Sequence, residues 1–331
     1  MVKVELFDDL GQVEHDAAGA LDRAAQPCLF SRLSWFRLLQ GHVPPKGSLK
    51  VARAADGDAK AWLFLANGGH EAEAYAAWYS LRVGAIGDAA LVPAIAEELR
   101  RSKLASLSLS PVEDPAPLVA GLRAAGWNVD ASPATGSWVA KTAGLSFDDY
   151  WAARPGQLRS TARRKAKAAE LEVEIHNDFN ADAWACYEQV YRASWKPEEG
   201  SFPFLRALAE QEGAAGTLRL GVARKDGVPV AVQFWTVENG KAIIHKLAYA
   251  EAAKPLSPGT ILGEAMFRRA IDEDRVDLID YGTGDDGYKR DWMDERRQLW
   301  RVTAFNPGTV RGVAGAARAG AGRLVGRLRS R

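Results

Sequence analysis

The chain has 331 residues, of which 47% are hydrophobic and 26% are charged, and its formal net charge is +1. This length favours two domains or one enlarged domain, and the composition excludes disordered and collagen-like chains. The two cysteines form no metal-binding pattern with the five histidines, so we expect no metal site and a reducing compartment. The sequence shows no signal-peptide pattern and no apolar run approaching the roughly 18 residues of a membrane span, which predicts a cytoplasmic protein.

Positive charge is concentrated near the C-terminus. Nine arginines and no acidic residue follow Glu295, so residues 1–295 carry a net charge of −8. In the segment 307–331, Arg323, Arg327 and Arg331 are spaced four apart, but many glycines make the segment a poor helix in water. Two interpretations stay open, a disordered cationic tail and a segment that orders on an anionic membrane surface. The second predicts peripheral contact with the inner face of the cell membrane.

The first half of the chain, 1–145, follows a mixed α/β order. The predicted elements are a strand at 2–7, helices at 15–24 and 31–40, a three-strand meander from Leu49, a helix at 88–101, a strand at 104–109, a helix at 115–125, and strands at 127–131 and 137–142.

The second half, 146–306, repeats this order. After a linking segment, the predicted elements are a strand at 171–175, helices at 181–195 and 202–212, a second meander from Leu218, a helix at 258–273, and strands at 277–280 and 298–305. The tripeptide Val-Ala-Arg recurs at 51 and 222, each time before an Asp-Gly turn. An offset of about half the chain indicates duplication rather than a solenoid. We therefore predict two similar mixed sheets, each flanked by helices.

The linking segment carries a basic helix face. Arg159, Arg163 and Lys167 recur at helical spacing, with Arg164 and Lys165 beside them. A solvated surface is the simpler interpretation, and a position near phosphates or anionic lipid is the alternative.

A candidate anion site follows the second meander, in the sequence PLSPGTILGEA. Ser257 is a natural N-cap and Pro258 a natural first helical residue. Gly259 allows a ligand close to the backbone, and we expect the amides of Gly259, Thr260 and Ile261 to point out of the helix N-terminus. A pyrophosphate would suit this position, although plain helix capping explains the same residues.

The meander, the segment SPGTILGEA and the later IDYGTGDDGYKRDWM together resemble the acyl-CoA N-acyltransferase domain of the GNAT superfamily, in its cellulose-biosynthesis acetyltransferase-like (CelD/BcsL-like) branch. The resemblance covers 146–307, and it includes SWK at 194–196 and HKLAY at 245–249. The first half is similar only in layout, as a degenerate GNAT-like domain, and the doubled architecture resembles the FemAB peptidyltransferases. The common phosphate loop Q/R-x-x-G-x-G/A is replaced here by Pro258-Gly259 and Gly263.

The resemblance implies an enzyme that transfers an acyl group from acyl-CoA, a co-substrate rather than a permanently bound cofactor, to an amine. It assigns the CoA pyrophosphate to Ser257, Gly259, Thr260 and Ile261. From its charge alone, Lys289 is a further candidate for phosphate binding, and the alternative is that it pairs with the aspartates and orders the turn. Trp195, Lys196 and Trp292 are candidates for substrate binding, although both tryptophans also suit packing.

Acyl transfer to an amine needs a proton acceptor and a proton donor for the leaving thiolate. Asp285 and Asp286 are adjacent carboxylates in a glycine-flanked turn, and one of such a pair can have its pKa raised by the other. His245 is a second candidate base. Tyr288 is a candidate donor to the thiolate, a role that tyrosine often has in this superfamily. The alternative for 281–292, YGTGDDGYKRDW, is a salt-bridged structural turn.

The acceptor is less defined by the sequence. The leading hypothesis is N-acylation of a sphingoid-type base by a long-chain acyl-CoA, as in a bacterial ceramide synthase-like enzyme. The alternatives are acylation of amino sugars in exopolysaccharide biosynthesis, a non-catalytic polysaccharide-assembly binding module, and a FemAB-like aminoacyl-tRNA transferase. No Walker, G-x-S-x-G, H-E-x-x-H or G-x-G-x-x-G signature occurs, and the acidic character of most of the chain argues against nucleic-acid binding.

Overall fold

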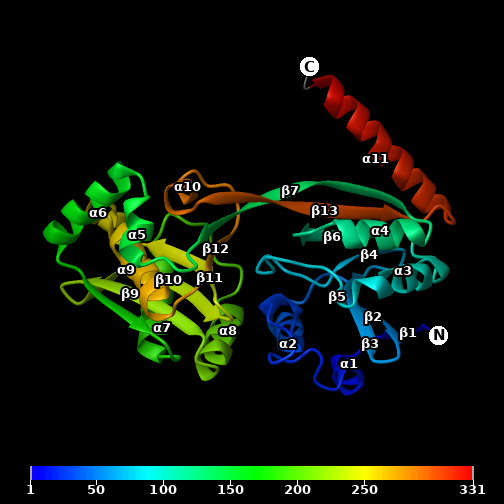
Figure 1. The fold of residues 1–331 in the computed structure, drawn as a ribbon, viewed down its shortest axis with the longest axis horizontal. Helices are drawn as coiled ribbons and strands as arrows, with labels where there is room; N and C mark the ends of the chain where they lie inside the picture. The colour runs from blue at the N-terminus through cyan, green and yellow to red at the C-terminus, as the bar shows by residue number, and fades with distance from the viewer. Residues whose placement is uncertain (1, 330–331) are drawn as a thin grey trace. The chain divides into compact units, whose positions relative to one another are not determined.

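The computed structural model describes residues 2–329, with side chains described for 2–321 (Figure 1). The chain forms two compact units. The first unit comprises Met1–Thr135 with Gln298–Arg331, and the second comprises Gly136–Arg297. Two long strands, β7 (Asn128–Lys141) and β13 (Glu295–Phe305), each contribute residues to both units.

The first unit contains a mixed sheet and flanking helices. Its elements are β1 (Lys3–Phe7), α1 (Leu10–Ala17), η1 (Leu29–Ser31), α2 (Leu33–His42), β2 (Ser48–Asp56), β3 (Ala59–Asn67), β4 (Glu71–Ala74), β5 (Ile86–Gly87), η2 (Ala89–Leu91), α3 (Val92–Arg101), β6 (Ser106–Val112), α4 (Ala116–Ala124) and α11 (Val310–Arg329). Strands β1 to β4 pair antiparallel in sequence order, β4 pairs parallel with β6, and β6 pairs antiparallel with β13.

The second unit has the same strand order. Its elements are α5 (Phe147–Ala152), α6 (Gly156–Ala169), β8 (Glu172–His176), α7 (Ala181–Arg192), α8 (Phe202–Ala214), β9 (Leu218–Lys225), β10 (Val228–Glu238), β11 (Lys241–Tyr249), η3 (Glu251–Leu256), α9 (Pro258–Arg268), the π-helical turn η4 (Arg269–Glu273), β12 (Leu278–Thr283) and α10 (Lys289–Trp292). Strands β8 to β11 pair antiparallel, β11 pairs parallel with β12, and β12 pairs antiparallel with β7. The predicted tandem mixed α/β architecture is confirmed.

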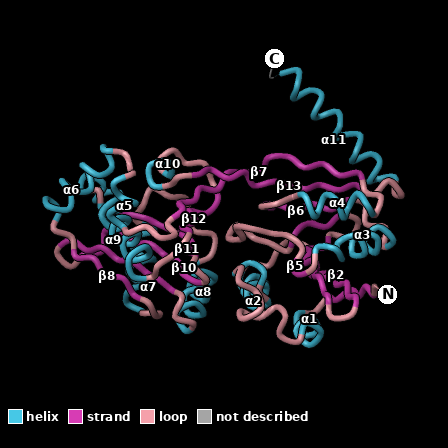
Figure 2. Tube along the Cα trace, in the orientation of Figure 1, coloured by secondary structure: helices cyan, strands magenta, loops and turns pink. Residues whose placement is uncertain are grey.

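Helices cover both faces of the second sheet, whose strands appear side by side in Figure 2. Neighbouring side chains of a strand point to opposite faces. On β10, Phe234 meets Trp184 of α7, whereas Trp235 meets Phe267 of α9. Both β10 side chains are fully buried, so α7 and α9 pack on opposite faces of the sheet.

Each unit takes its last strand from a distant part of the sequence. The first unit uses β13, whose Trp300–Phe305 pair with β6, and the second uses β7, whose Ser137–Lys141 pair with β12. The compact units therefore place 136–145 in the second unit and 298–306 in the first, whereas the division predicted from sequence at 145 and 306 follows chain order. The predicted domain boundaries at 145 and 306 stay a prediction.

Several predicted elements need correction. The prediction of a helix at 15–24 is wrong. Helix α1 begins at Leu10, where the Asp9 side chain accepts hydrogen bonds from the amides of Gly11 and Gln12. It ends at Ala17, because the next residue, Ala18, is in the left-handed conformation with φ of 48°. The two strands expected at 127–131 and 137–142 form the single strand β7.

The C-terminal segment is helical from Val310, although its glycines predict a poor helix. A Cβ at Gly312 would lie 2.1 Å from the Asn306 carbonyl oxygen, and one at Gly315 would lie 2.7 Å from the Phe305 ring. Glycine therefore lets this helix begin close against the end of β13. The side chains of Arg323, Arg327 and Arg331, on which the predicted membrane contact rests, lie outside the described residues. None of the helices in the described part of the chain combines the length and apolar character of a membrane span.

Candidate active site

The parallel strands β11 and β12 separate partway along their length. They pair only through Lys241↔Leu278, Ala242↔Ile279 and Ile243↔Asp280. Strand β11 then continues to Tyr249, still paired with β10 on its other side. The two strands therefore part beside the second half of β11, where its backbone groups have no ladder partner from β12, and this place is called the opening below.

His245 lies in a β-bulge at the start of this opening. In the β10–β11 ladder, Phe234 pairs with Lys246 and Trp235 with Ile244, so His245 is the extra residue. Its Nε2 lies 2.9 Å from the Thr236 hydroxyl, and burial lowers the pKa of the imidazole to about 4. Bulges are frequent beside active sites. At neutral pH this imidazole is uncharged, and such a low pKa makes it a weak proton acceptor.

The α9 N-terminus lies at the end of β11, after η3. Ser257 is the N-cap and Pro258 the first helical residue, as the sequence predicts, but the Ser257 side chain makes no capping bond and its φ is +55°. The prediction that three amides point out of the helix is wrong for two of them. The amides of Thr260 and Ile261 donate to the Ser257 carbonyl at 3.1 and 3.3 Å, because the carbonyl of an N-cap residue accepts the first hydrogen bonds of its helix.

Gly259 lies beside the end of β11. A Cβ at this position would lie 3.2 Å from the Tyr249 ring, which is tighter than ordinary contact. The Ile261 side chain is buried, so it does not face a ligand.

The basic helix α6 packs against this region. Lys165 donates from Nζ to the Pro255 carbonyl at 2.6 Å, just before α9. Four other basic residues of α6, Arg159, Arg163, Arg164 and Lys167, are exposed, and the helix has no acidic residue. The helix therefore places positive charge beside the segment that leads into the candidate phosphate site.

The second half of β12 is held by the buried carboxylate of Asp280. It accepts hydrogen bonds from the Ser137 hydroxyl at 3.1 Å and the Gly282 amide at 2.9 Å, and it lies 3.2 Å from the Lys241 ammonium. Gly282 and Gly284 have φ of 67° and 105°, which glycine adopts readily. These contacts hold an irregular part of β12, where its register with β7 shifts between Asp280 and Thr283.

Asp285 is engaged in structural contacts. Its carboxylate accepts from Trp138 Nε1 at 2.9 Å and pairs with the Arg296 guanidinium, whose Nη2 lies 2.6 Å away. The hydrogen bond from Arg296 lowers the pKa of this carboxyl, so it holds a proton poorly. Asp286 is exposed and lies 3.8 Å from the Lys289 ammonium.

Lys289 is buried beneath the segment. Its ammonium donates to the Thr283 carbonyl at 2.7 Å and the Gly284 carbonyl at 3.4 Å, and it lies 5.5 Å from the Tyr281 ring centre. Burial lowers the pKa of this lysine. Its contacts order the turn, and its role as a phosphate-binding cation stays a prediction.

Tyr288 is half-exposed on the same segment. Its ring meets the buried Tyr281 edge-to-face at 5.8 Å. Burial, with the nearby charge of Asp286, raises the pKa of the Tyr288 hydroxyl. The hydroxyl therefore keeps its proton at neutral pH.

The three predicted substrate-binding residues have different surroundings. Trp195 is 48% exposed and packs at 4.1 Å against Tyr249, the last residue of β11. Trp292 is buried, with its ring 4.9 Å from Phe267 and 5.5 Å from Trp151. It therefore belongs to the core beneath the opening, and its contacts are those of a packing residue.

Lys196 lies among charged side chains from both sides of the opening. Burial lowers the pKa of its ammonium to about 8, and the charge of Lys246 acts in the same direction. The charges of Asp286, Lys289 and Glu199 also act on it. The structure thus brings Lys196 of the α7–α8 loop toward β11 and the 281–292 segment.

Sequence reasoning missed the ion pair that supports this cluster. Lys246 Nζ lies 2.9 Å from Glu199 Oε2, and the Glu199 side chain is almost fully buried. Lys246 lies in the motif HKLAY, but nothing in the sequence joins it to an acidic residue 47 positions away. Asp280 was missed as well, although it stands directly before the motif residues YGTG.

A family model described as "Acetyltransferase (GNAT) domain" matches residues 153–290. This match indicates a GNAT-type acyltransferase domain within the second unit. The match spans β8 to β12, and with them the opening, α9 and most of the 281–292 segment. No curated protein matches the chain.

Solved structures share the fold at low sequence identity. FemX aligns with a TM-score of 0.61 and 12% identity, covering 91% of this chain and 98% of that one. The C-terminal domain of a proposed lysylphosphatidylglycerol synthetase from Agrobacterium fabrum aligns with a TM-score of 0.54 and 15% identity, covering 77% and 83%. L-PGS from Bacillus licheniformis aligns with a TM-score of 0.53 and 13% identity, covering 88% and 95%. These likenesses support the tandem GNAT-like fold.

Proposed function

We propose that the protein is an N-acyltransferase that moves an acyl group from acyl-CoA to an amine of a membrane or envelope acceptor. The observation that carries the proposal is the end of the β11–β12 ladder at Ile243↔Asp280, inside the region that matches the GNAT family. The resulting opening is flanked by the α9 N-terminus and by the 281–292 segment. An extended thioester arm could add to the unpaired edge of β11 as a short strand, through backbone hydrogen bonds.

The phosphates of the donor would lie at the start of α9. The helix dipole and the Gly259 amide favour an anion there, and α6 adds positive charge through its contact between Lys165 and Pro255. Ser257, Thr260 and Ile261 would contribute through their positions in the first turn. Because Thr260 and Ile261 already donate to Ser257, α6 would have a larger share in binding the phosphates than the sequence suggests.

The chemistry would use Lys196 and Tyr288. The amine attacks the thioester carbonyl carbon, a C–N bond forms and the C–S bond breaks. Neutral Lys196 accepts the proton from the amine, because its pKa of about 8 lies near neutral pH. The Tyr288 hydroxyl donates a proton to the departing thiolate. Asp285, Asp286 and His245, the bases expected from sequence, are less suited, since Asp285 is paired with Arg296 and His245 is a weak base.

For the acceptor, we propose a sphingoid-type base acylated by a long-chain acyl-CoA, with amino sugars of exopolysaccharides as the alternative. The exposed basic face of α6 supports an encounter with anionic membrane surface. The test is incubation of the purified protein with acyl-CoA and either sphinganine-type bases or amino sugars, measuring free CoA. Release with amino sugars alone would exclude the lipid acceptor. A polysaccharide-binding module without catalysis would neither bind CoA nor release it.

A second candidate, which follows from the resemblance to the FemAB peptidyltransferases, is aminoacyl transfer from charged tRNA, and the chain shares its fold with FemX. Both donors carry phosphates that the basic α6 face would attract. A side-by-side assay with acyl-CoA and with charged tRNA separates them. Transfer from acyl-CoA together with none from charged tRNA supports the first proposal.

A further inference from the structure

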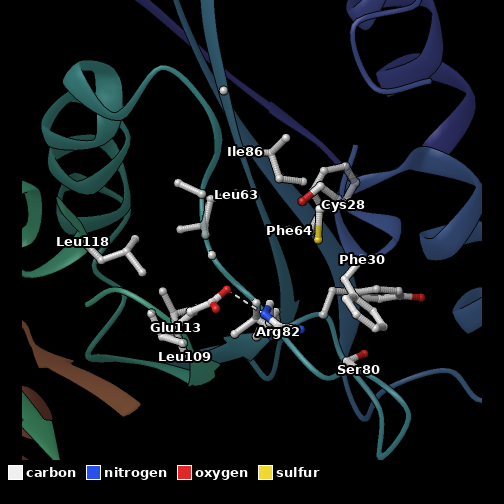
Figure 3. Close-up of a pocket in the computed structure, with 18 of the residues that line it drawn as sticks. Cys28, Phe30, Leu63, Phe64, Ser80, Arg82, Ile86, Leu109, Glu113 and Leu118 are labelled. Atoms are coloured by element: carbon white, nitrogen blue, oxygen red, sulfur yellow. Dashed lines mark hydrogen bonds and ion pairs between the residues drawn. The ribbon is translucent and has the colours of Figure 1, made fainter. Parts of the chain in front are cut away.

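The first unit contains a cavity of about 280 Å³ that the proposed transfer mechanism does not use (Figure 3). In the figure, Leu63 of β3, Ile86 of β5 and Leu118 of α4 surround one space. The volume is roughly twice that of an engineered apolar cavity of about 150 Å³ that binds benzene. A small apolar group therefore has room to enter.

The cavity lies at the first unit's equivalent of the β11–β12 opening. The parallel strands β4 and β6 pair only through Glu71↔Ser106, Ala72↔Leu107 and Glu73↔Ser108. Beyond that point, Ala74 after β4's last pair and Leu109 on β6 both line the cavity. The chain follows the sheet edge up to Tyr75, whose amide donates to the Phe64 carbonyl, and it returns to the sheet where β5 pairs with β3. Residues 76–85 lie between these two points, and part of this segment forms a wall of the cavity.

The walls are mainly apolar. The aromatic lining residues are Phe30, Trp35, Phe36, Phe64 and Tyr75, and four of the aliphatic ones are Leu63, Leu109, Val112 and Leu118. Trp35 and Phe64 are buried and hold the shape of the space. Such a surface favours an alkyl chain over a polar ligand, because burial of apolar area is the main gain.

An anionic head group is disfavoured in this unit. At the helix start that corresponds to α9, the Asp88 carboxylate accepts the Ala90 amide at 2.9 Å, so the capping position already holds a negative charge. Three charged residues line the cavity, Arg82, Glu113 and Asp114, and their sum is −1. Arg82 Nε is bonded to Glu113 Oε2 at 2.6 Å, and both carboxylate residues are exposed.

We propose that this cavity binds the alkyl chain of a long-chain primary amine, whose ammonium lies at the mouth beside Glu113 and Asp114. Such a ligand has the functional group that an N-acyltransferase modifies. Its identification as the acceptor rests on the proposed function, whereas its binding does not. In the first unit, the cavity occupies the position that corresponds to the proposed acyl-CoA site of the second unit. Its apolar walls and carboxylates suit an alkylamine instead.

Calorimetric titration of the full chain with n-decylamine, n-decanol and decanoate, without acyl-CoA, tests this proposal. We expect the amine to bind about fivefold tighter than the alcohol, because its ammonium adds one charge contact with the exposed carboxylates at the mouth. The decanoate carboxylate should bind most weakly, because these carboxylates repel it. Glu113→Gln should lower amine affinity by about the same factor and leave alcohol binding unchanged. Glu73→Gln, an exposed change on β4 outside the cavity lining, is the matched control.

Leu118→Phe, which places a larger ring in the cavity, should weaken the amine and the alcohol alike. If this variant fails to fold, the comparison of Glu113→Gln with Glu73→Gln still decides the head-group assignment. Preference for decanoate, no binding of any probe, or equal amine affinity in Glu113→Gln and the unchanged chain would each overturn the proposal. CoA titration is a separate measurement, so loss of amine binding with retained CoA binding contradicts only this inference.

Discussion

Ile243 and Asp280 form the last pair of the parallel ladder between β11 and β12. Beyond Ile243, strand β11 meets the bulge at His245. Beyond Asp280, the register of β12 with β7 shifts where the Gly282 amide donates to the Asp280 carboxylate. The place where the two strands part is therefore fixed on both sides by local contacts.

Removal of the Tyr288 hydroxyl should slow the transfer step. We expect Tyr288→Phe to lower kcat by about a hundredfold, the usual contribution of a positioned proton donor. The ring contact with Tyr281 remains, so CoA affinity and thermal stability should not change. Thiol release under saturating acyl-CoA measures the effect, and a variant with full turnover would assign Tyr288 to the structure of the turn.

Lys196 should determine the acidic limb of the pH profile. Its pKa is lowered to about 8, and only the neutral amine accepts a proton, so activity should rise with pH up to about 8 and then level off. Lys196→Arg keeps the positive charge but does not deprotonate, so we expect a loss of about a hundredfold and no rise near pH 8. The comparison uses kcat/KM measured across this range.

The matched control for this experiment is Lys254→Arg, a change of an exposed lysine on η3. It should keep both the rate and the pH profile of the unchanged chain. An unaltered acidic limb in Lys196→Arg would mean that ionisation of the acceptor amine, rather than of Lys196, produces it.

Asp285 should matter for the order of the turn more than for proton transfer. Since Arg296 and Trp138 hold its carboxylate, Asp285→Asn should weaken these contacts and reduce kcat by less than about tenfold. The effect should shrink at high salt, because exposed ion pairs are screened. A loss as large as that of Tyr288→Phe, independent of salt, would restore Asp285 as a candidate base.

Gly263 on α9 should be sensitive to a single added carbon. A Cβ there would lie 3.0 Å from the Trp292 ring, and both groups belong to the packed core. We expect Gly263→Ala to lower the free energy of unfolding by about 1–3 kcal/mol, as overpacking does. Gly156→Ala at the start of α6 is the control, since no atom lies within 4 Å of its added Cβ. Denaturant unfolding compares the two, and equal stability would contradict the packing of Trp292 against α9.

Much of the fold could be predicted from the sequence, because strands and helices follow local patterns. The repeated Val-Ala-Arg and Asp-Gly turns predicted two meanders, and both are present as β2–β4 and β9–β11. The exchange of final strands could not be predicted, because the pairing of Trp300 with Val112 joins residues far apart in the sequence. No local pattern encodes such a pairing.

The candidate site could be predicted only in part. The segments 255–263 and 281–292 flank the opening between β11 and β12, as their motifs suggested. The roles of single residues changed, because they depend on burial and on partners from other segments. Asp285 meets Arg296 and Trp138, Lys289 meets its own turn, and Lys196 gains a depressed pKa near Lys246.

Calorimetric titration of the full chain with CoA measures whether the donor binds to this protein. We expect saturable binding that weakens when Arg163 and Arg164 of α6 are both changed to Gln, since these exposed residues add positive charge to the helix that contacts the segment before α9. The double variant Arg100→Gln with Arg101→Gln, on α3 of the first unit, should bind CoA like the unchanged chain. Absence of CoA binding to the folded, unchanged protein would contradict acyl-CoA-dependent transfer at the β11–β12 opening.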